Sequence, residues 1–127
     1  MKVDILSPEK LIPTLEASAV SIPTVLGYMG ILPGHTAYIT ELDSGGVIVN
    51  STEGQQRYFI SGGYLQIEDD QIKIIADGVE PAGDIDFSRA EEALKRAQGR
   101  LSSFQADTDI DRASKSKKRA EERIKLK

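Results

Sequence analysis

The 127-residue sequence predicts an N-terminal antiparallel β-sandwich followed by a C-terminal antiparallel two-helix hairpin. Two periodicities carry this prediction. The first part of the chain alternates apolar and polar residues, which is typical of strands with one buried face. From Phe87 onward, apolar residues recur every three or four positions, which is typical of an amphipathic helix. The change falls at Pro81-Ala82-Gly83, so we expect a sandwich over residues 1–84 and a hairpin over residues 85–127.

Apolar pairs separated by one polar residue mark the expected strands, and they are Val3 with Ile5, Val20 with Ile22, and Ile72 with Ile74. Turn signals rich in Gly, Asp and Ser separate such segments every 8–10 residues or so, a spacing that suits a compact antiparallel sandwich. They fall at residues 43–46, 51–54, 61–63 and 68–70. Pro8, Pro13 and Pro23 should lie at edges or strand ends, because proline cannot donate to a ladder.

The first helix should begin after Asp86, whose side chain suits the N-cap position, with Ile85 and Ala90 available as a small hydrophobic staple. Its apolar stripe consists of Phe87, Ala90, Leu94, Ala97, Leu101 and Phe104. A polar break at residues 105–107 follows, and Thr108 or Asp109 can cap a second helix. The stripe of that helix is weaker and consists of Ile110, Ala113, Lys117, Ala120 and Ile124. We expect either a marginally docked helix or a frayed C-terminal end.

The composition excludes several kinds of functional site. The sequence has no cysteine, which excludes disulfides, thiolate metal sites and a cysteine nucleophile. No apolar run approaches the roughly 20 residues needed to cross a bilayer, and Asp4 interrupts what would be the core of a secretory signal, so we expect a soluble chain that is not exported. Residues 1–84 carry 12 acidic and 4 basic side chains, whereas residues 85–127 carry 8 acidic and 12 basic ones. This asymmetry indicates two parts with different partners.

Three motifs in fixed order carry a family resemblance. They are Gly30-Ile31-Leu32-Pro33-Gly34-His35, Ser61-Gly62-Gly63-Tyr64-Leu65-Gln66-Ile67 and Ile85-Asp86-Phe87-Ser88-Arg89-Ala90. In this order and at these distances the whole chain resembles the ε subunit of the rotary proton-translocating (F-type) ATP synthase. Two positions depart from the usual pattern: Tyr28 stands where many relatives carry an acidic or polar residue, and Gln66 replaces a common glutamate.

The resemblance implies a non-catalytic central-stalk subunit that couples rotation to proton flow. Its sandwich would bind the γ subunit and the membrane rotor ring, and its hairpin would inhibit ATP hydrolysis by extending toward the catalytic subunits. Its place would be the cytoplasmic face of the bacterial inner membrane, or the stromal side of the thylakoid in a plastid-encoded protein, attached only through the complex. No cofactor would be required. ATP would be a regulatory ligand.

The segment around the first motif is the expected partner interface. The resemblance implies that Tyr28, Met29, Ile31, Leu32 and His35 face the rotor ring and the γ subunit. His35 is the only histidine, and the sequence shows neither a cluster of ligands at metal spacing nor a nucleophile-elbow pattern around it. We therefore expect a structural or interface role for His35, with no metal site and no catalytic residue. A small hydrolase that uses His35 is the competing hypothesis.

Arginines of the hairpin are the expected ligand site. Arg89 and Arg96 lie seven residues apart on one helix face, and a chain reversal near residue 107 would bring Arg123 near Arg89 and Arg119 near Arg96. Four guanidiniums at one seam favour an anion, because their forks match phosphate oxygens. The alternative is a solvated basic face with the helical pairs Glu91–Lys95 and Glu92–Arg96. The resemblance implies an ATP site formed by Glu80, Asp86, Arg89, Arg96, Arg119 and Arg123.

Two further hypotheses come from other classes. A free-standing β-sandwich binding module could use residues 87–104 as a helical oligomerisation tail. A nucleic-acid-binding tail could use the basic residues 112–127, but that segment lacks aromatic side chains. We therefore expect no nucleic-acid partner.

Overall fold

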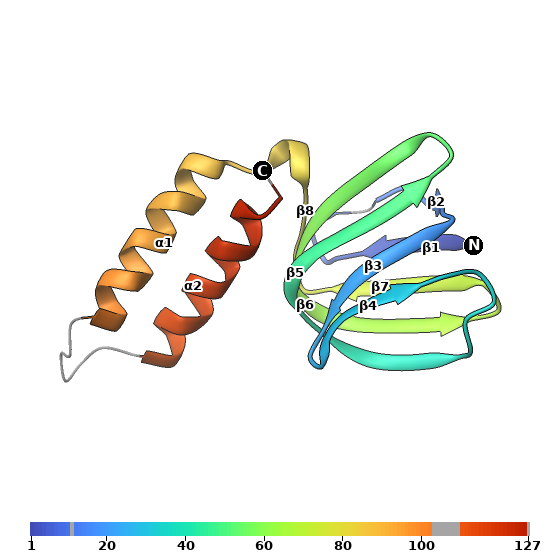
Figure 1. Ribbon diagram of the computed structural model, residues 1–127, viewed down its shortest axis with the longest axis horizontal. Helices are drawn as coiled ribbons and strands as arrows, with labels where there is room; N and C mark the ends of the chain where they lie inside the picture. Colours follow the sequence, from blue (N-terminus) through green and yellow to red (C-terminus); the bar gives the residue numbers. More distant parts are fainter. Residues whose placement is uncertain (11, 103–109, 127) are drawn as a thin grey trace.

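The computed structural model describes residues 1–10, 12–102 and 110–126 of the chain. It consists of a strand-rich N-terminal part and two C-terminal helices that lie beside it (Figure 1). The expected fold class, a β-sandwich followed by a helical hairpin, is confirmed. A short helical turn, η1 (Ala82–Asp84), leads from the last strand to the first helix.

Among the described residues, eight strands form one continuous hydrogen-bonded sheet: β1 (Lys2–Leu6), β2 (Leu15–Glu16), β3 (Ala19–Thr24), β4 (Gly27–Ile31), β5 (Tyr38–Ser51), β6 (Gly54–Glu68), β7 (Gln71–Ala76) and β8 (Val79–Pro81). The order is β2-β1-β7-β6-β5-β3-β4, and β8 pairs with β6. All pairs are antiparallel except β1 with β7, which is parallel, so the expectation of a purely antiparallel sheet misses this one pair.

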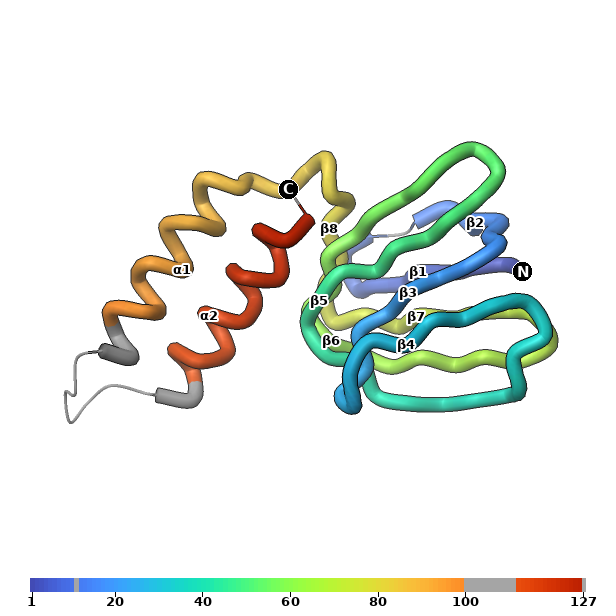
Figure 2. The backbone as a smooth tube through the Cα atoms, in the orientation of Figure 1, coloured from blue at the N-terminus to red at the C-terminus, as the bar shows by residue number. Residues whose placement is uncertain are grey.

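The long strands β5 and β6 bend, and the sheet curls so that its inner faces enclose one core (Figure 2). The six residues of the predicted alternations are all at most 2% exposed and belong to this core, namely Val3, Ile5, Val20, Ile22, Ile72 and Ile74. The period-of-two pattern is therefore confirmed as the inward face of β1, β3 and β7.

Two of the four expected turns reverse the chain. Residues 51–54 join β5 to β6, and residues 68–70 join β6 to β7. The turns expected at residues 43–46 and 61–63 are wrong, because both segments lie within the long strands β5 and β6. Pro23 is the second-last residue of β3, next to a shift in the β3–β5 register, and Pro8 and Pro13 lie outside the strands.

Close packing explains why glycines occur at the positions that were wrongly expected to be turns. A Cβ on Gly46 would lie 2.8 Å from Cδ2 of Leu126, and a Cβ on Gly45 would lie 2.7 Å from the hydroxyl oxygen of Tyr28. Gly63 has a φ of +138°, and a Cβ there would collide with the carbonyl oxygen of Ile75. These glycines allow other segments to approach the bent sheet rather than reversing the chain.

The two helices are α1 (Phe87–Ser102) and α2 (Ile110–Ile124). The backbone N–H of Arg89 donates to Oδ1 of Asp86 at 3.0 Å, which confirms Asp86 as the N-cap. Phe104, the break at residues 105–107 and the caps Thr108 and Asp109 fall outside the described residues, as do the side chains of Leu101 and Ile110. No helix in the described ranges is long and apolar enough to span a bilayer.

Alanines form the centre of the hairpin interface. Each is at most 4% exposed, and they are Ala90 and Ala97 of α1 with Ala113 and Ala120 of α2. Their predicted positions in the two stripes are confirmed. Alanine buries little apolar surface, so the helices gain only a small hydrophobic contribution from this seam.

A second face of α2 docks on the sandwich, with α2 lying between α1 and the bent strands β5 and β6 (Figure 1). Leu126, which follows α2, is buried with Phe59 of β6 and with Ile85, and Phe87 packs against this cluster. The two predicted stripes do not include this face, because it comprises polar residues and a single leucine beyond the helix end.

The conformation of Gly63 gives a first prediction. Gly63→Ala should lower the free energy of unfolding by about 3 kcal/mol or more, because the positive φ is strained for alanine and the methyl group meets the β7 backbone. Gly30→Ala is the matched control, since a Cβ at Gly30 meets nothing within 4 Å. Urea unfolding of both variants measures the difference. Equal stability of the two variants would show that the close approach of β6 and β7 is not required.

Candidate functional site

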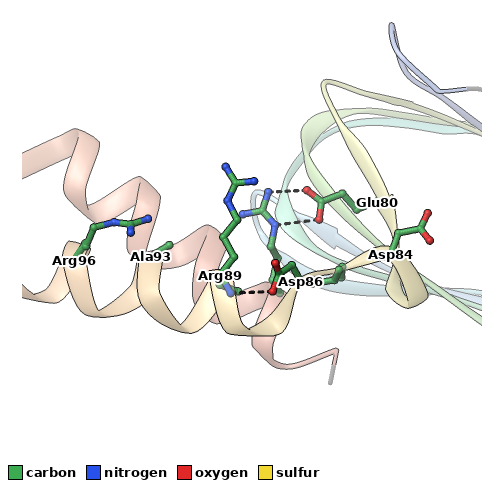
Figure 3. A pocket seen from close by; sticks show the side chains of 9 residues that line it. Glu80, Asp84, Asp86, Arg89, Ala93 and Arg96 are labelled. Atoms are coloured by element: carbon green, nitrogen blue, oxygen red, sulfur yellow. Dashed lines mark hydrogen bonds and ion pairs between the residues drawn. The ribbon is translucent and has the colours of Figure 1, made fainter.

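A cavity of about 410 Å³ lies where the sandwich meets the hairpin (Figure 3). Residues from β8, the η1–α1 junction, the first turns of α1 and the end of α2 line it: Glu80, Asp84, Ile85, Asp86, Arg89, Ala90, Ala93, Arg96 and Arg123. Five of the six residues expected at a ligand site therefore come together here, namely Glu80, Asp86, Arg89, Arg96 and Arg123.

Arg123 is held in place on two sides. Its Nη2 donates to Oε1 of Glu80 at 3.0 Å and its Nε donates to Oε2 at 3.3 Å. Its guanidinium carbon lies 4.2 Å from the centre of the Phe59 ring. A forked ion pair combined with ring stacking fixes the direction of a guanidinium well. Arg123 therefore ties the end of α2 to β8 and β6 and forms a fixed wall of the cavity.

The other two carboxylates at the cavity also have partners. Asp86 accepts the Arg89 backbone N–H as the helix cap, and Asp84 pairs with Nζ of Lys10 at 3.5 Å. With Glu80 on Arg123, each carboxylate at the rim is thus engaged with a group other than the Arg89 or Arg96 guanidinium.

Arg89 and Arg96 are the uncompensated charges of the site. Within residues 1–10, 12–102 and 110–126, neither guanidinium forms an ion pair, and the helical pair Glu92–Arg96 of the solvated-face alternative does not close. Figure 3 shows both side chains on the side of α1 that carries Ala93 and faces the cavity. Two unpaired cations at one opening attract an anion, and their planar forks suit phosphate or carboxylate oxygens.

The cavity also has an apolar wall. Ile85 and Ala90 are buried, and Ala93 lies between the two arginines on α1. The site thus combines cations with a small apolar surface. Sequence reasoning did not assign Ala93 or Asp84 to the site. The spacing of Arg89 and Arg96 is the signal for Ala93, because the residue between them lies on the same face.

Arg119 does not join this site. It lines a second cavity, of about 460 Å³, between α2 and the bend of β5 and β6, together with Lys115 and Lys118. Its Nη2 donates to the hydroxyl of Ser116 at 3.3 Å. The expectation that Arg119 lies near Arg96 is therefore wrong in this conformation, because its side chain follows the face of α2 that docks on the sandwich.

Polar contacts fasten that docked face. Lys118 pairs with Asp43 of β5. Burial of Asp43 acts to raise its pKa, but hydrogen bonds from Lys118 and from the Ser44 N–H outweigh burial, and the pKa of Asp43 is lowered. The hydroxyl of Tyr28 donates to Oε2 of Glu122 at 2.9 Å.

Tyr28 therefore has a role within the chain that the sequence did not reveal. Burial raises the pKa of Tyr28, and the Glu122 carboxylate adds to this effect against an opposing hydrogen bond from Gly46. The hydrogen bond and charge of Glu122 also raise the pKa of Lys125.

The loop after β4 is a tight turn, as its glycines and proline predict. The N–H of His35 donates to the carbonyl of Leu32 at 3.3 Å, and Gly34 has a φ of +83°. The N–H of Gly34 donates to Oδ1 of Asp70 at 2.8 Å, which fastens the loop to the β6–β7 turn.

The expected interface residues differ in exposure. Leu32 is 64% exposed and Ile31 only 1%, so Ile31 belongs to the core and offers no surface to a partner here. Met29 packs partly against the core. Nδ1 of His35 donates to the Thr36 carbonyl at 2.7 Å, and its ring meets Tyr38 edge-on. Among the described residues, no three His, Asp or Glu side chains are grouped to hold a metal ion.

Fold and cavity together define a small two-part protein with a docked, basic helical hairpin. Its two parts match two family models: "ATP synthase, Delta/Epsilon chain, beta-sandwich domain" over residues 1–82 and "ATP synthase, Delta/Epsilon chain, long alpha-helix domain" over residues 83–127. The chain therefore belongs to the ATP synthase delta/epsilon chain family. The resemblance to the ε subunit of the F-type ATP synthase is confirmed.

Individual proteins of this family are similar to the chain over most of its length. The ATP synthase epsilon chain of Moorella thermoacetica is 36% identical over 126 residues, which cover 98% of this chain and 94% of the relative. That of Bacillus velezensis is 36% identical over 124 residues, with the same shares covered. A chain in the Euglena gracilis mitochondrial ATP synthase structure (OSCP, F1 and c-ring) superimposes with a TM-score of 0.83 at 25% identity, covering 94% of this chain and 76% of that one.

The lowered pKa of Asp43 gives a second prediction. Because this pKa lies below its ordinary value of 3.8 in the folded chain, the pair with Lys118 stabilises the fold above that value and is lost as the pH falls through the folded-state pKa. The difference in Tm between the wild type and Asp43→Asn should therefore shrink from about pH 5 downward and vanish in strong acid. Circular dichroism melts measure it. Glu53→Gln, at the exposed β5–β6 turn, is the control. A Tm difference between the wild type and Asp43→Asn that stays constant with pH would contradict the pairing of Asp43 with Lys118.

Proposed function

We propose that this chain is a non-catalytic subunit of the ATP synthase central stalk, and that the cavity between its two parts binds ATP as a regulatory ligand. Family membership supports the first statement. One observation carries the second: the guanidiniums of Arg89 and Arg96 open into the cavity without an ion-pair partner in the described part of the chain.

The cavity suits a nucleotide in size and chemistry. Its volume of about 410 Å³ falls within the range of roughly 300–1,000 Å³ typical of ligand pockets. The phosphates would lie on Arg89 and Arg96, whose forks match phosphate oxygens, and the base would lie against Ile85, Ala90 and Ala93. The sequence contains no G-x-x-x-x-G-K-[ST] loop, so the site would hold ATP without being built to hydrolyse it.

ATP would act on the position of the hairpin. The buried apolar part of the docking face is limited to Leu126, Phe59 and Ile85, so the docked hairpin also depends on the polar contacts of α2 and on whatever binds at the cavity. A ligand favours a conformation only through its differential affinity for it. Since the cavity requires Arg123 of α2 beside Arg89 of α1, ATP would favour the docked state. The undocked hairpin would extend along the γ subunit toward the catalytic subunits and inhibit ATP hydrolysis.

The sandwich would carry the stalk contacts. Leu32, in the loop after β4, is an exposed apolar side chain of the kind that marks a protein-partner surface. We assign it to the γ subunit and the membrane rotor ring, at the cytoplasmic face of the bacterial inner membrane. The oligomerisation-tail alternative is disfavoured, because Ala90 and Ala97 of its stripe are buried within this chain.

Calorimetric titration with ATP tests the ligand. Wild-type protein should bind ATP saturably, and Arg89→Gln/Arg96→Gln should weaken binding by tenfold or more, since a hydrogen bond to a charged group contributes about 1.5–3 kcal/mol. Arg119→Gln removes one arginine charge outside the cavity and serves as the control. No binding by the wild type at millimolar ATP, or equal loss in the control, would refute the site.

The assembled enzyme tests the regulation. With ATP abundant, a complex that contains the Arg89→Gln/Arg96→Gln chain should hydrolyse ATP more slowly than the wild-type complex, because its hairpin is no longer held in the docked state. Steady-state hydrolysis by the two complexes measures this effect. Equal rates would separate the hairpin from inhibition even if ATP binds the isolated chain.

A further inference from the structure

Tyr28 connects three elements by one hydroxyl group. It lies on β4, its oxygen accepts the backbone N–H of Gly46 on β5 at 3.1 Å, and its hydrogen goes to Oε2 of Glu122 on α2 at 2.9 Å. Glu122 also accepts from Nζ of Lys125 at 3.0 Å. Both hydrogen-bonding capacities of the phenol are thus used to join the sheet to the end of the hairpin.

The burial of Glu122 makes this hydrogen bond important for the docking of α2. It is 8% exposed, and among the described residues it is the one charged residue that is buried. A buried carboxylate needs hydrogen-bond donors, and leaving it without them is costly. Lys125 lies at the end of the same helix and moves with it, so the docked position of α2 depends on the donor that Tyr28 supplies.

The surrounding sequence makes room for this arrangement. A Cβ on Gly45 would lie 2.7 Å from the Tyr28 hydroxyl, and a Cβ on Gly46 would lie 2.8 Å from Leu126. Two consecutive glycines therefore admit both the phenol and the leucine beyond α2 to the surface of the sheet. The hydroxyl, the carboxylate and the leucine all fasten the same turn of the hairpin.

We propose that Tyr28 is a positioning residue that latches the last turn of α2 on the sandwich and thereby places Arg123 at the cavity. Glu122 and Arg123 are neighbours in one helical turn, so a turn fixed through Glu122 also fixes the guanidinium that Glu80 receives. The latch deepens the proposed function, because it sets the fraction of chains whose ATP site is assembled.

Spin labels test the latch directly. The sequence contains no cysteine, so Glu53→Cys on the sandwich and Ser114→Cys on α2 give one unique pair of nitroxide labels in the full chain. Pulsed electron–electron double resonance then measures the distance between the two labels, and hence the docked and undocked populations, without ATP. Tyr28→Phe should lower the docked-to-undocked ratio about tenfold or more, because it removes a hydrogen bond to a charged group. Tyr38→Phe, another exposed tyrosine, should leave the ratio unchanged.

A mutant cycle separates a latch from a general structural effect. Glu122→Met removes the acceptor, and adding Tyr28→Phe to it should cause no further loss of docking, because the two residues act through one hydrogen bond. Additive losses, or a wild-type ratio in Tyr28→Phe, would overturn the proposal. If Tyr28→Phe is too unstable to measure, Glu122→Met alone decides, because it removes the same hydrogen bond and should lower the docked fraction.

ATP titration distinguishes the two proposals. If the wild type binds ATP, Tyr28→Phe should weaken binding in proportion to its lost docked fraction, and an unchanged affinity would show that Tyr28 does not position the site. If the wild type does not bind ATP, the proposed ligand fails, whereas the spin-label populations still confirm or overturn the latch.

Discussion

The docked hairpin depends on the missing side chains of Gly45 and Gly46. These glycines lie in the middle of β5, where the sheet bends, and any larger residue would push away the Tyr28 hydroxyl or Leu126. Without that close approach, Leu126 leaves its cluster with Phe59 and the end of α2 loses its contact with the sheet. The cavity is then lost as well, because Arg123 forms one of its walls only while α2 lies against the sandwich.

Polar contacts rather than apolar area determine where α2 sits. The seam between the helices consists of alanines, and the apolar docking cluster has three buried members. The charges compensate, since an acidic sandwich meets a basic hairpin and Arg123 and Lys118 of α2 find Glu80 and Asp43 on the sheet. Ion pairs on a surface contribute little individually, but a forked and stacked pair such as that of Arg123 gives a defined geometry. The result is a hairpin with a precise but weakly stabilised position.

The sequence could predict what periodicity and local chemistry encode. Alternating Val and Ile residues predicted the inward faces of three strands, and Asp86 predicted the start of α1. The glycine pairs at residues 45–46 and 62–63 were misread as turns, because glycine serves both chain reversal and close packing, and only the long-range pairing of β5 with β6 distinguishes the two. The parallel β1–β7 pair has no local signal for the same reason.

Some residues of the candidate site could likewise be predicted from the sequence, and others could not. Arg89 and Arg96 could be placed on one face from their spacing alone, and a chain reversal predicted Arg123 beside Arg89. Glu80 required the family resemblance to join them. Arg119 was misplaced because it lies on the face of α2 that docks on the sandwich, where its guanidinium donates to Ser116 of the same helix. The hydrogen bond of Tyr28 to Glu122 spans most of the chain, and no pattern of spacing can encode such a contact.

Under the proposed function, weak docking would make one turn of α2 a sensor of the ligand. Glu122 and Arg123 are adjacent in the sequence. Glu122 accepts a hydrogen bond from Tyr28 of β4, and Arg123 lines the cavity and pairs with Glu80. A ligand that binds only the docked state stabilises it by about 2.7 kcal/mol at a concentration 100 times its Kd. Such a contribution would hardly affect a hairpin with a large hydrophobic interface. Docking on the sandwich rests on three buried apolar residues and a few polar contacts, so under the proposed function a ligand of modest affinity would suffice to favour the docked hairpin.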